Sequence, residues 1–363
     1  MYSESELDAA VQARLMTPAT AAHFRTFVAK SREASAADEE YVRLLSSFND
    51  VFVTAALLLA LVGTGALLRQ LFATPLIAFF AVAALAWLGA EYFTIRRKLA
   101  LPSFVLFLAF AAGVLGAVFW GLAPAFAPGM TDLDQLRSRP TEPLWMLATA
   151  AGLWAGSSAY WYRFRLPVAV AAGAIGAGAG VLLLLQMAAP MAMLLHPYAG
   201  PMIVGLAMFG FAMWWDMSDV YRQTRRSDVA FWLHLLAAAL IVHSAFGILG
   251  VSPSSDDVGG GGAAVTILLY LFFCLVALAI DRRAILVSSL VYVLAAFSTT
   301  LSWGVGSAPL AMTVSAIVLG SGLLTLSVWW GRLRRALLNR LPAGLRAQLP
   351  RADLEIAAAR PVA

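Results

Sequence analysis

From residue 51 onward the chain alternates between long apolar blocks and short polar turns, and this pattern limits the possible folds more than any other feature. Ten blocks can be delimited, each near the length at which an α-helix crosses about 30 Å of hydrocarbon. The pattern predicts an all-α polytopic membrane protein with about ten transmembrane helices. The predicted spans are 51–68, 74–93, 101–123, 143–162, 167–187, 200–215, 230–250, 263–280, 284–302 and 309–330.

Two pairs of spans are separated by only three or four residues. Arg163–Arg165 divides the fourth span from the fifth, and Asp281–Arg283 divides the eighth from the ninth. A single helix over 263–302 would be about twice as long as the bilayer is thick. An arginine held at the bilayer centre would also cost about 3 kcal/mol or more. We therefore expect tight hairpins that keep these arginines at the membrane surface.

The composition agrees with a bilayer environment. Hydrophobic residues make up 61% of the chain and charged residues 12%, whereas soluble domains are about half apolar and a quarter charged. The net charge is +5, but the arginines fall between apolar blocks, so the basic balance suits membrane topology and predicts no nucleic-acid partner. The single cysteine, Cys274, provides neither an internal disulfide nor a cysteine-based metal site. We expect no cofactor.

Positive charge gives an independent test of topology, because Lys and Arg are retained on the cytoplasmic side of a membrane. With the N-terminus inside and the spans alternating, 22 of the 25 Lys and Arg residues fall on the cytoplasmic side. The three exceptions are Arg69, Arg137 and Arg139. This distribution predicts that both termini are cytoplasmic.

Residues 1–50 are polar and precede the transmembrane domain of residues 51–330. They are predicted to form a cytoplasmic helical region, with helices over 4–15, from Thr17-Pro18 onward, and over 39–48. The region has few large apolar side chains, so a stable independent core is not expected. We expect it to lean on the membrane or on a partner.

The tail, residues 331–363, is predicted to be a basic amphipathic cytoplasmic segment. Its leucines recur at helical spacing between arginines, and Pro342 ends the pattern. Such a helix suits the anionic lipids of the cytoplasmic leaflet, and a topology anchor is favoured over a regulatory device. The leucines are Leu333, Leu337, Leu338 and Leu341.

A helix, a short basic turn and a second helix recur along the chain. One interpretation is that every cytoplasmic turn needs arginines, and the other is that a two-helix hairpin has been duplicated. In the first turn, Glu91 is expected to pair with Arg96. The turns begin near Glu91, Trp161, Asp216 and Asp281, and a half-repeat begins at Trp329.

The densest polar stretch lies in the turn between the sixth and seventh spans. Three carboxylates and three arginines occur there within 13 residues. One interpretation is an ion-paired cytoplasmic turn. The other is a site for an anion or for protons, in which Ser227 or Asp228 caps the seventh helix and the helix dipole attracts a phosphate or carboxylate. The candidate polar or ion path comprises Asp216, Asp219, Arg225, Arg226, Asp228, His234 and His243.

His234 and His243 share the seventh span. A spacing of nine residues puts them on opposite helix faces, about 13 Å apart along the axis, so they cannot bind one metal ion together. No HExxH motif is present, and we expect no metal site. His243 should lie within the hydrocarbon, where an ionisable group is a functional candidate. The alternative is a neutral imidazole bonded to a neighbouring helix.

Glycines on two spans are predicted to pack helices closely together. Gly152 and Gly156 form a GxxxG motif on the fourth span, and Gly176 and Gly180 form another on the fifth. The glycine run around Gly176 is similar to a dinucleotide-binding fingerprint only superficially, because no strand precedes it.

Four segments carry a resemblance that extends over nearly the whole chain. They are Leu15–Pro18, Phe48–Val53, Thr224–His234 and the leucine-rich basic tail with Pro342 and Pro350. With these segments the chain resembles an uncharacterised family of bacterial polytopic inner-membrane proteins that have a short N-terminal helical region and no known function. The resemblance implies a location in the bacterial inner membrane and implies no activity.

Two functional hypotheses follow. The first is a transporter or permease-like protein for a small solute, which should show a hydrated cavity near the membrane midplane reached by His243 or Gln186. The second is a non-catalytic membrane scaffold or assembly protein, which holds a protein partner with its N-terminal region and keeps polar groups at the faces of a packed bundle. An enzyme is the least favoured class, because no paired intramembrane carboxylates or nucleophile motif can be found.

Overall fold

The computed structural model describes residues 11–13, 15–21, 23–24, 48–126, 143–219, 224–250, 260–305, 307–346 and 349. Every regular element in these ranges is helical, which confirms the predicted all-α class for this part of the chain. The helices are α3 (Phe48–Leu71), α4 (Leu76–Ala90), η1 (Glu91–Arg96), α5 (Ala100–Phe126), α6 (Pro143–Phe164), α7 (Pro167–Ala188), α8 (Pro190–Leu195), α9 (Ala199–Met217), α10 (Arg225–Ile248), α11 (Gly260–Ile280), α12 (Ala284–Val305), α13 (Ala308–Leu338) and α14 (Ala343–Arg346).

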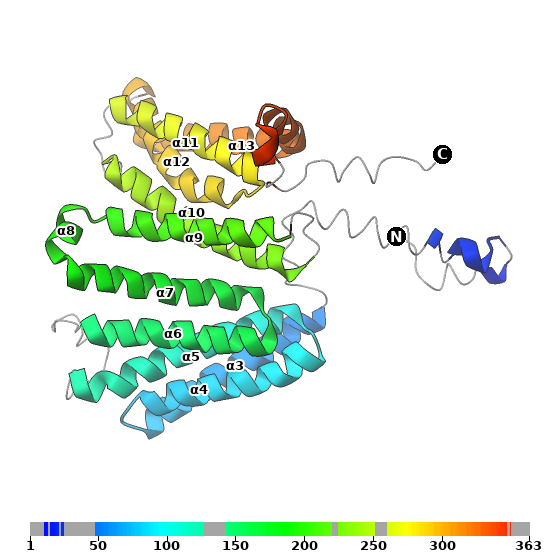
Figure 1. The fold of residues 1–363 in the computed structure, drawn as a ribbon, viewed down its shortest axis with the longest axis vertical. Coiled ribbons are helices and arrows are strands. Elements are labelled where there is room, and N and C mark those ends of the chain that lie inside the picture. The colour runs from blue at the N-terminus through cyan, green and yellow to red at the C-terminus, as the bar shows by residue number, and fades with distance from the viewer. Residues whose placement is uncertain are drawn as a thin grey trace.

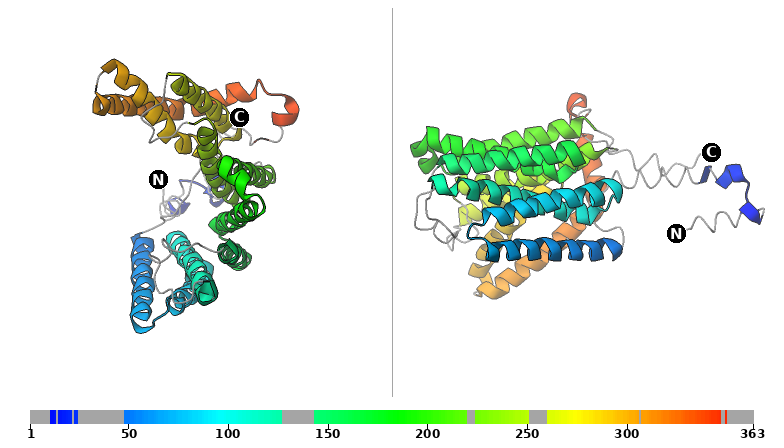
Figure 2. Two further views of the ribbon diagram at one scale, coloured as in Figure 1. Left: turned by 90° about the vertical axis from the view of Figure 1, so that its left-hand side faces the viewer. Right: turned by 90° about the horizontal axis from the view of Figure 1, so that it is seen from below.

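The long helices lie side by side in a stack, and successive helices run in opposite directions (Figure 1). The short helix α8 lies at one end of the stack, and α14 lies at the other. Figure 2 shows the same stack from two further sides. The turns after η1, α6, α9 and α11 lie at the α14 end, which we call the basic end because its turns carry arginines.

Six helices of the described chain are long and apolar enough to cross a membrane. They are α3, α4 with η1, α5, α7, α10 and α13. Two shorter apolar stretches, Ala264–Ile280 and Ile285–Thr299, belong to α11 and α12. The structure thus supports a membrane protein at the level of helix length and composition.

α10 lies at the centre of the packing. It contacts α7, α9 and α12, and 50% of its most apolar 18-residue stretch is buried, against 11% for α3 and for α13. Exposed leucines and phenylalanines on the outer helices, such as Leu59, Phe80 and Leu324, suit a lipid environment better than water. Of the six helices that are long and apolar enough to cross a membrane, α10 is therefore the most buried.

The predicted packing glycines meet different neighbours. A Cβ added to Gly176 would lie 2.7 Å from the backbone nitrogen of Trp154, so α6 and α7 approach backbone to backbone there. Added Cβ atoms at Gly152 and Gly156 would meet valine side chains of α5 at 2.8 and 3.1 Å. Gly180 has ordinary space, because its nearest neighbour, a Leu147 methyl, would be 3.7 Å away.

Three tight turns at the basic end share one backbone feature. Lys98, Arg165 and Asp281 have φ angles of 53°, 54° and 58°, in the left-handed region where helices usually end with glycine. Each residue lies within two residues of a helix end, and the next helix starts at most three residues later. A non-glycine residue pays about 1–2 kcal/mol in this conformation, so surrounding contacts must hold each turn. The shared geometry is compatible with both interpretations of the repeat.

The ends of the chain are described only in part. Thr17 caps the helical turn that follows it, because its hydroxyl accepts a hydrogen bond from the Thr20 backbone N–H at 3.1 Å, as predicted. The predicted helix over 39–48 lies outside the described residues except for residue 48, and the helix over 4–15 lies largely outside them. At the other end, α13 continues past the predicted span end at 330 and stops at Leu338, four residues before Pro342.

Candidate functional site

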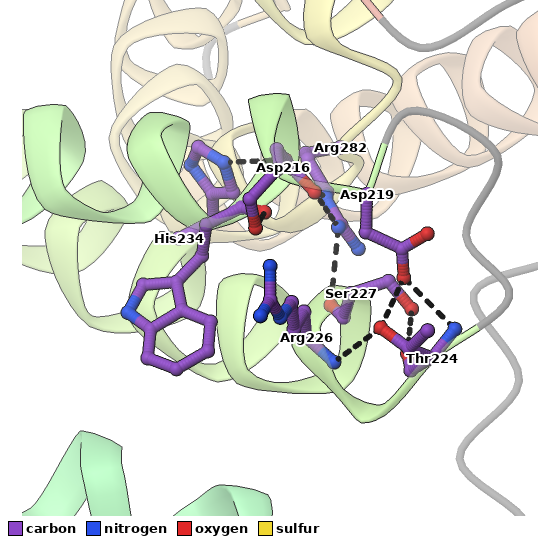
Figure 3. Close-up of polar contacts among 9 residues, drawn as sticks. Asp216, Asp219, Thr224, Arg226, Ser227, His234 and Arg282 are labelled. Carbon is purple, nitrogen blue, oxygen red and sulfur yellow. Dashed lines mark hydrogen bonds and ion pairs between the residues drawn. The ribbon is translucent and has the colours of Figure 1, made fainter.

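A buried charged cluster joins three parts of the chain at the basic end (Figure 3). Asp216, in the last turn of α9, accepts hydrogen bonds from two nitrogens of Arg282 in the α11–α12 turn, from Nη2 at 2.5 Å and from Nε at 3.3 Å. The same carboxylate lies 2.9 Å from Nε2 of His234 on α10. All three side chains are at most 3% exposed. The cluster is therefore a nearly dry, multiply bonded ionic group.

The position of Asp216 explains why it needs a cation. A carboxylate in the last turn of a helix faces the negative end of the helix dipole and is disfavoured there. The planar guanidinium of Arg282 offsets this with two hydrogen bonds in a bidentate arrangement. Arg282 Nη2 also donates to the Ser227 carbonyl in the first turn of α10, at 3.2 Å. One arginine thus ties α9 and α10 to the α11–α12 turn.

Asp219 organises the start of α10. Its carboxylate accepts hydrogen bonds from the backbone N–H and the hydroxyl of Thr224, at 2.8 and 2.7 Å (Figure 3). Thr224 is the N-cap of α10, because its hydroxyl accepts a hydrogen bond from the Arg226 backbone N–H. The expected cap at Ser227 or Asp228 was wrong. Thr224 has the extended backbone that an N-cap requires, whereas Ser227 and Asp228 already lie inside the helix.

Arg225 and Asp228 line a cavity of about 380 Å³ at the basic end, together with Lys98 and Arg165. Nη1 of Arg225 donates to the Arg165 carbonyl at 3.3 Å, which links the α6–α7 turn to the start of α10. The side chains of Arg225, Arg226 and Asp228 are exposed. These three residues therefore belong to the surface of the basic end, apart from the buried Asp216 cluster.

His243 makes a separate contact farther along α10, and its side chain is exposed. Its Nδ1 lies 2.5 Å from the hydroxyl of Tyr292 on α12, and the ring of Tyr198 packs edge-on against the imidazole. His234 faces α9 and His243 faces α12, as their nine-residue spacing predicts. The predicted path residues are thus divided among the buried cluster, the surface of the basic end, and the α10–α12 contact.

Each basic turn is linked to the next one along the chain, and we call this set of contacts the turn network. Glu91 of η1 accepts two hydrogen bonds from Arg163 of α6, at 2.8 and 2.6 Å. The expected Glu91–Arg96 pair was wrong, because the α6 end brings Arg163 into bidentate geometry across the interface. The α6–α7 turn then meets α10 through Arg225, as described above, and α9 meets the next turn through Asp216 and Arg282.

The last link of the turn network reaches α13. Asp281 accepts a hydrogen bond from Nε1 of Trp330 at 2.7 Å, and Nε of Arg334 lies 3.6 Å from the same oxygen. The guanidinium of Arg283 lies 4.9 Å from the centre of the Trp330 ring. The network thus runs in chain order from the first basic turn to the long C-terminal helix.

Sequence reasoning missed the partners Arg282 and Tyr292. Arg282 is one of several arginines in basic turns, and nothing local distinguishes it from Arg283, which is exposed. The one available signal was the carboxylate of Asp216 at the end of an apolar helix, since such a group requires a cation from elsewhere. The Asp216 carboxylate thus predicts a cationic partner but does not indicate which residue that partner is.

Within the described residues, no group of three or more His, Cys, Asp or Glu side chains is arranged to hold a metal ion. Asp216 and His234 provide two ligand types in contact, but Arg282 occupies the carboxylate that a metal ion would use. The cluster is therefore built for ionic pairing.

Comparisons with models of protein families, with curated proteins and with solved structures give no match for this chain.

Proposed function

We propose that this chain is a bacterial inner-membrane protein that crosses the bilayer ten times with both termini in the cytoplasm. The antiparallel order of the helices supports an even number of crossings, since the first residue of α3 and the last residue of α13 both lie at the basic end. The arginine-bearing turns at that end support a cytoplasmic orientation. The bacterial inner membrane is the location that the family resemblance implies.

We infer that its role is that of a non-catalytic membrane scaffold. The observation that carries this inference is the turn network, in which polar side chains bond across helices at one end of the bundle. Two of the predicted path residues, Asp216 and Arg225, take part in it. His243 is bonded to Tyr292, and Gln186 is exposed on α7. This arrangement of polar groups suits a bundle that keeps one conformation.

Energetics favour the same conclusion. A transporter of the alternating-access type must open the cytoplasmic end of its bundle in each cycle. Opening between α9 and the α11–α12 turn would separate Asp216 from Arg282. Separation of a buried ion pair without replacement partners costs about 3–5 kcal/mol. The turn network therefore opposes the motion that transport requires.

Small-solute transport is the second candidate. The cavity of about 380 Å³ at the basic end favours it, because Lys98, Arg165 and Arg225 surround a space that suits a small anion. Asp228 is the one carboxylate among the residues that line this cavity.

Purification of the full-length protein from bacterial membranes, followed by mass spectrometry of everything that co-elutes, separates the two candidates. A scaffold should retain a protein partner in fixed stoichiometry, and removal of residues 1–47 should release that partner without changing the Tm of the bundle. The variant Arg332→Gln, at an exposed position of α13, serves as a control that leaves the N-terminal region intact. A stoichiometric small molecule with no protein partner would overturn the scaffold proposal in favour of transport.

A further inference from the structure

An apolar groove runs along α7 between α6 and α9, on the outside of the bundle. Its volume is about 590 Å³, within the range of about 300–1,000 Å³ that is common for sites of small ligands. Small residues of α7, among them Gly173, Ala174 and Ala177, form its floor. The walls carry larger apolar side chains, including Trp154, Trp161, Ile203, Val204, Phe211 and Trp215.

The groove exists because α7 has little side-chain volume on this face. α6 and α9 both pack against α7, and Gly178 allows Met208 and Val204 of α9 to approach closely. Ala177 is exposed at the floor, and Trp154 and Phe211 are 53% and 41% exposed on opposite walls. In a bilayer we expect an elongated apolar molecule to fill such a groove, because the side chains that line an empty groove lack dispersion contacts on one side.

One end of the groove is cationic. Arg165 lies at the basic end, lines both the groove and the 380 Å³ cavity, and has its guanidinium 5.7 Å from the centre of the Trp161 ring. Arg163 and Arg282 are neutralised by carboxylates, whereas Arg165 forms no ion pair with any residue in the described ranges. Lys98 likewise has no ion-pair partner there and lines the same cavity.

A buried donor lies between the cationic end and the apolar floor. Nε1 of Trp215, in the groove wall near the end of α9, has no hydrogen-bond partner within the described part of the chain. Tryptophan nitrogens at membrane interfaces normally bond to polar groups at the depth of the lipid headgroups. The order along the groove is therefore cation, N–H donor and apolar channel.

We propose that this groove holds an anionic phospholipid, with its phosphate at Arg165 and Lys98 and one acyl chain along the floor formed by α7. Phosphate is the natural partner of an unpaired guanidinium, an ester carbonyl matches the Trp215 N–H, and an acyl chain matches the apolar channel. Asp228 is the one carboxylate among the residues that line the 380 Å³ cavity, so Lys98, Arg165 and Arg225 leave a positive balance there. The inference rests on the proposed membrane insertion and is independent of a scaffold role.

The test uses the full-length protein in detergent, titrated with phosphatidylglycerol or with phosphatidylcholine of identical acyl chains. Native mass spectrometry then counts the bound lipids, and thermal unfolding reports the stabilisation. We expect wild type to retain phosphatidylglycerol preferentially. Arg165→Gln should weaken that binding roughly fivefold, the effect expected of one basic residue near an anionic surface, without changing the binding of phosphatidylcholine.

Two further variants separate the parts of the site. Ala177→Phe fills the exposed floor of the groove and should reduce the binding of both lipids, while the lipid-free protein keeps its Tm. Arg332→Gln removes an exposed arginine of α13 at the same end and serves as the matched control, with unchanged lipid binding. Equal retention of the two lipids by wild type would overturn the proposal. Unchanged binding in Ala177→Phe, or a protein found seated in the groove, would overturn it as well.

The outcomes also separate this proposal from the proposed function. A missing lipid preference together with a retained protein partner would remove the lipid site and leave the scaffold standing. A selective lipid site in a protein that retains no protein partner would support the lipid site and overturn the scaffold proposal.

Discussion

At the scale of single residues, the most consequential group is the carboxylate of Asp216. It is the shared acceptor for Arg282 and His234, and it lies in a nearly dry environment. In such a place the removal of one partner leaves the other charge without compensation, which is far more costly than the loss of an exposed ion pair.

The variant Asp216→Asn should therefore be strongly destabilising. We expect a loss of about 3–5 kcal/mol in the free energy of unfolding, because Arg282 remains buried without its carboxylate. Thermal unfolding in detergent measures this as a lowered Tm. The matched variant Asp219→Asn replaces a charged acceptor in the N-cap loop by a neutral one and should lose about 1–2 kcal/mol. Equal effects of the two variants would contradict the assignment of Asp216 as a buried ionic centre.

The double variant Asp216→Asn/Arg282→Gln gives a second, independent readout. Since both charges are then removed together, it should be more stable than the sum of the two single losses predicts. The double-mutant cycle in the same detergent gives the coupling free energy. Strict additivity would show that the two side chains do not stabilise each other.

His243 and Tyr292 are expected to act as one hydrogen-bonded unit between α10 and α12. Tyr292→Phe removes the hydroxyl and should destabilise the protein by about 1 kcal/mol. His243→Phe in the Tyr292→Phe background should then lose less than His243→Phe alone. Unfolding measurements on the four proteins test this, and identical losses in both backgrounds would argue against the contact.

At this scale the sequence predicted where the polar groups gather, but it did not predict their hydrogen-bond and ion-pair partners. The stretch from Asp216 to His234 was recognisable because charge is rare in this chain. The bonds from Asp216 to Arg282 and from His243 to Tyr292 join residues 66 and 49 positions apart, and one sequence carries no distance information over such separations. The Thr224 cap was missed because three neighbouring residues are all plausible caps.

At the scale of helices, length and polarity were the reliable signals. Each of the ten apolar blocks falls on one described helix of 15 or more residues, and six of these helices are long and apolar enough to cross a membrane. The ends were less predictable. α13 extends eight residues beyond the predicted span, since its arginines continue the helix after the apolar block stops. An apolar block therefore locates the apolar part of a helix, whereas capping and packing determine the residues at which the helix begins and ends.

The glycines of α7 test how closely it approaches α6. Gly176→Ala would bring a methyl group within 2.7–2.8 Å of the α6 backbone, so we expect a loss of about 1–3 kcal/mol in unfolding free energy. Gly180→Ala, four residues later on the same helix, meets only a leucine methyl at 3.7 Å and should be neutral or slightly stabilising. The Tm values of the two variants test the contact. A tolerated alanine at Gly176 would mean that the helices are farther apart than described.

At the scale of the whole molecule, the turn network connects the helices in chain order. Glu91 links η1 to α6, Arg282 links the α11–α12 turn to α9 and α10, and Asp281 links that turn to α13. The sequence predicted that arginines would gather on one side. The sequence did not predict that side chains of one basic turn would bond to the next turn. Those contacts depend on which helices become neighbours in space.

The proposed topology requires all the basic turns to lie on the cytoplasmic side of one membrane. Single cysteines introduced into a Cys274→Ala background, and labelled with a membrane-impermeant maleimide in right-side-out and inverted vesicles, test this directly. Ser218→Cys and Asn339→Cys, at the basic end, should label only in inverted vesicles, whereas Ala73→Cys and His196→Cys, at the opposite end, should label only in right-side-out vesicles. Labelling of Ser218→Cys and Asn339→Cys from different sides would contradict the account.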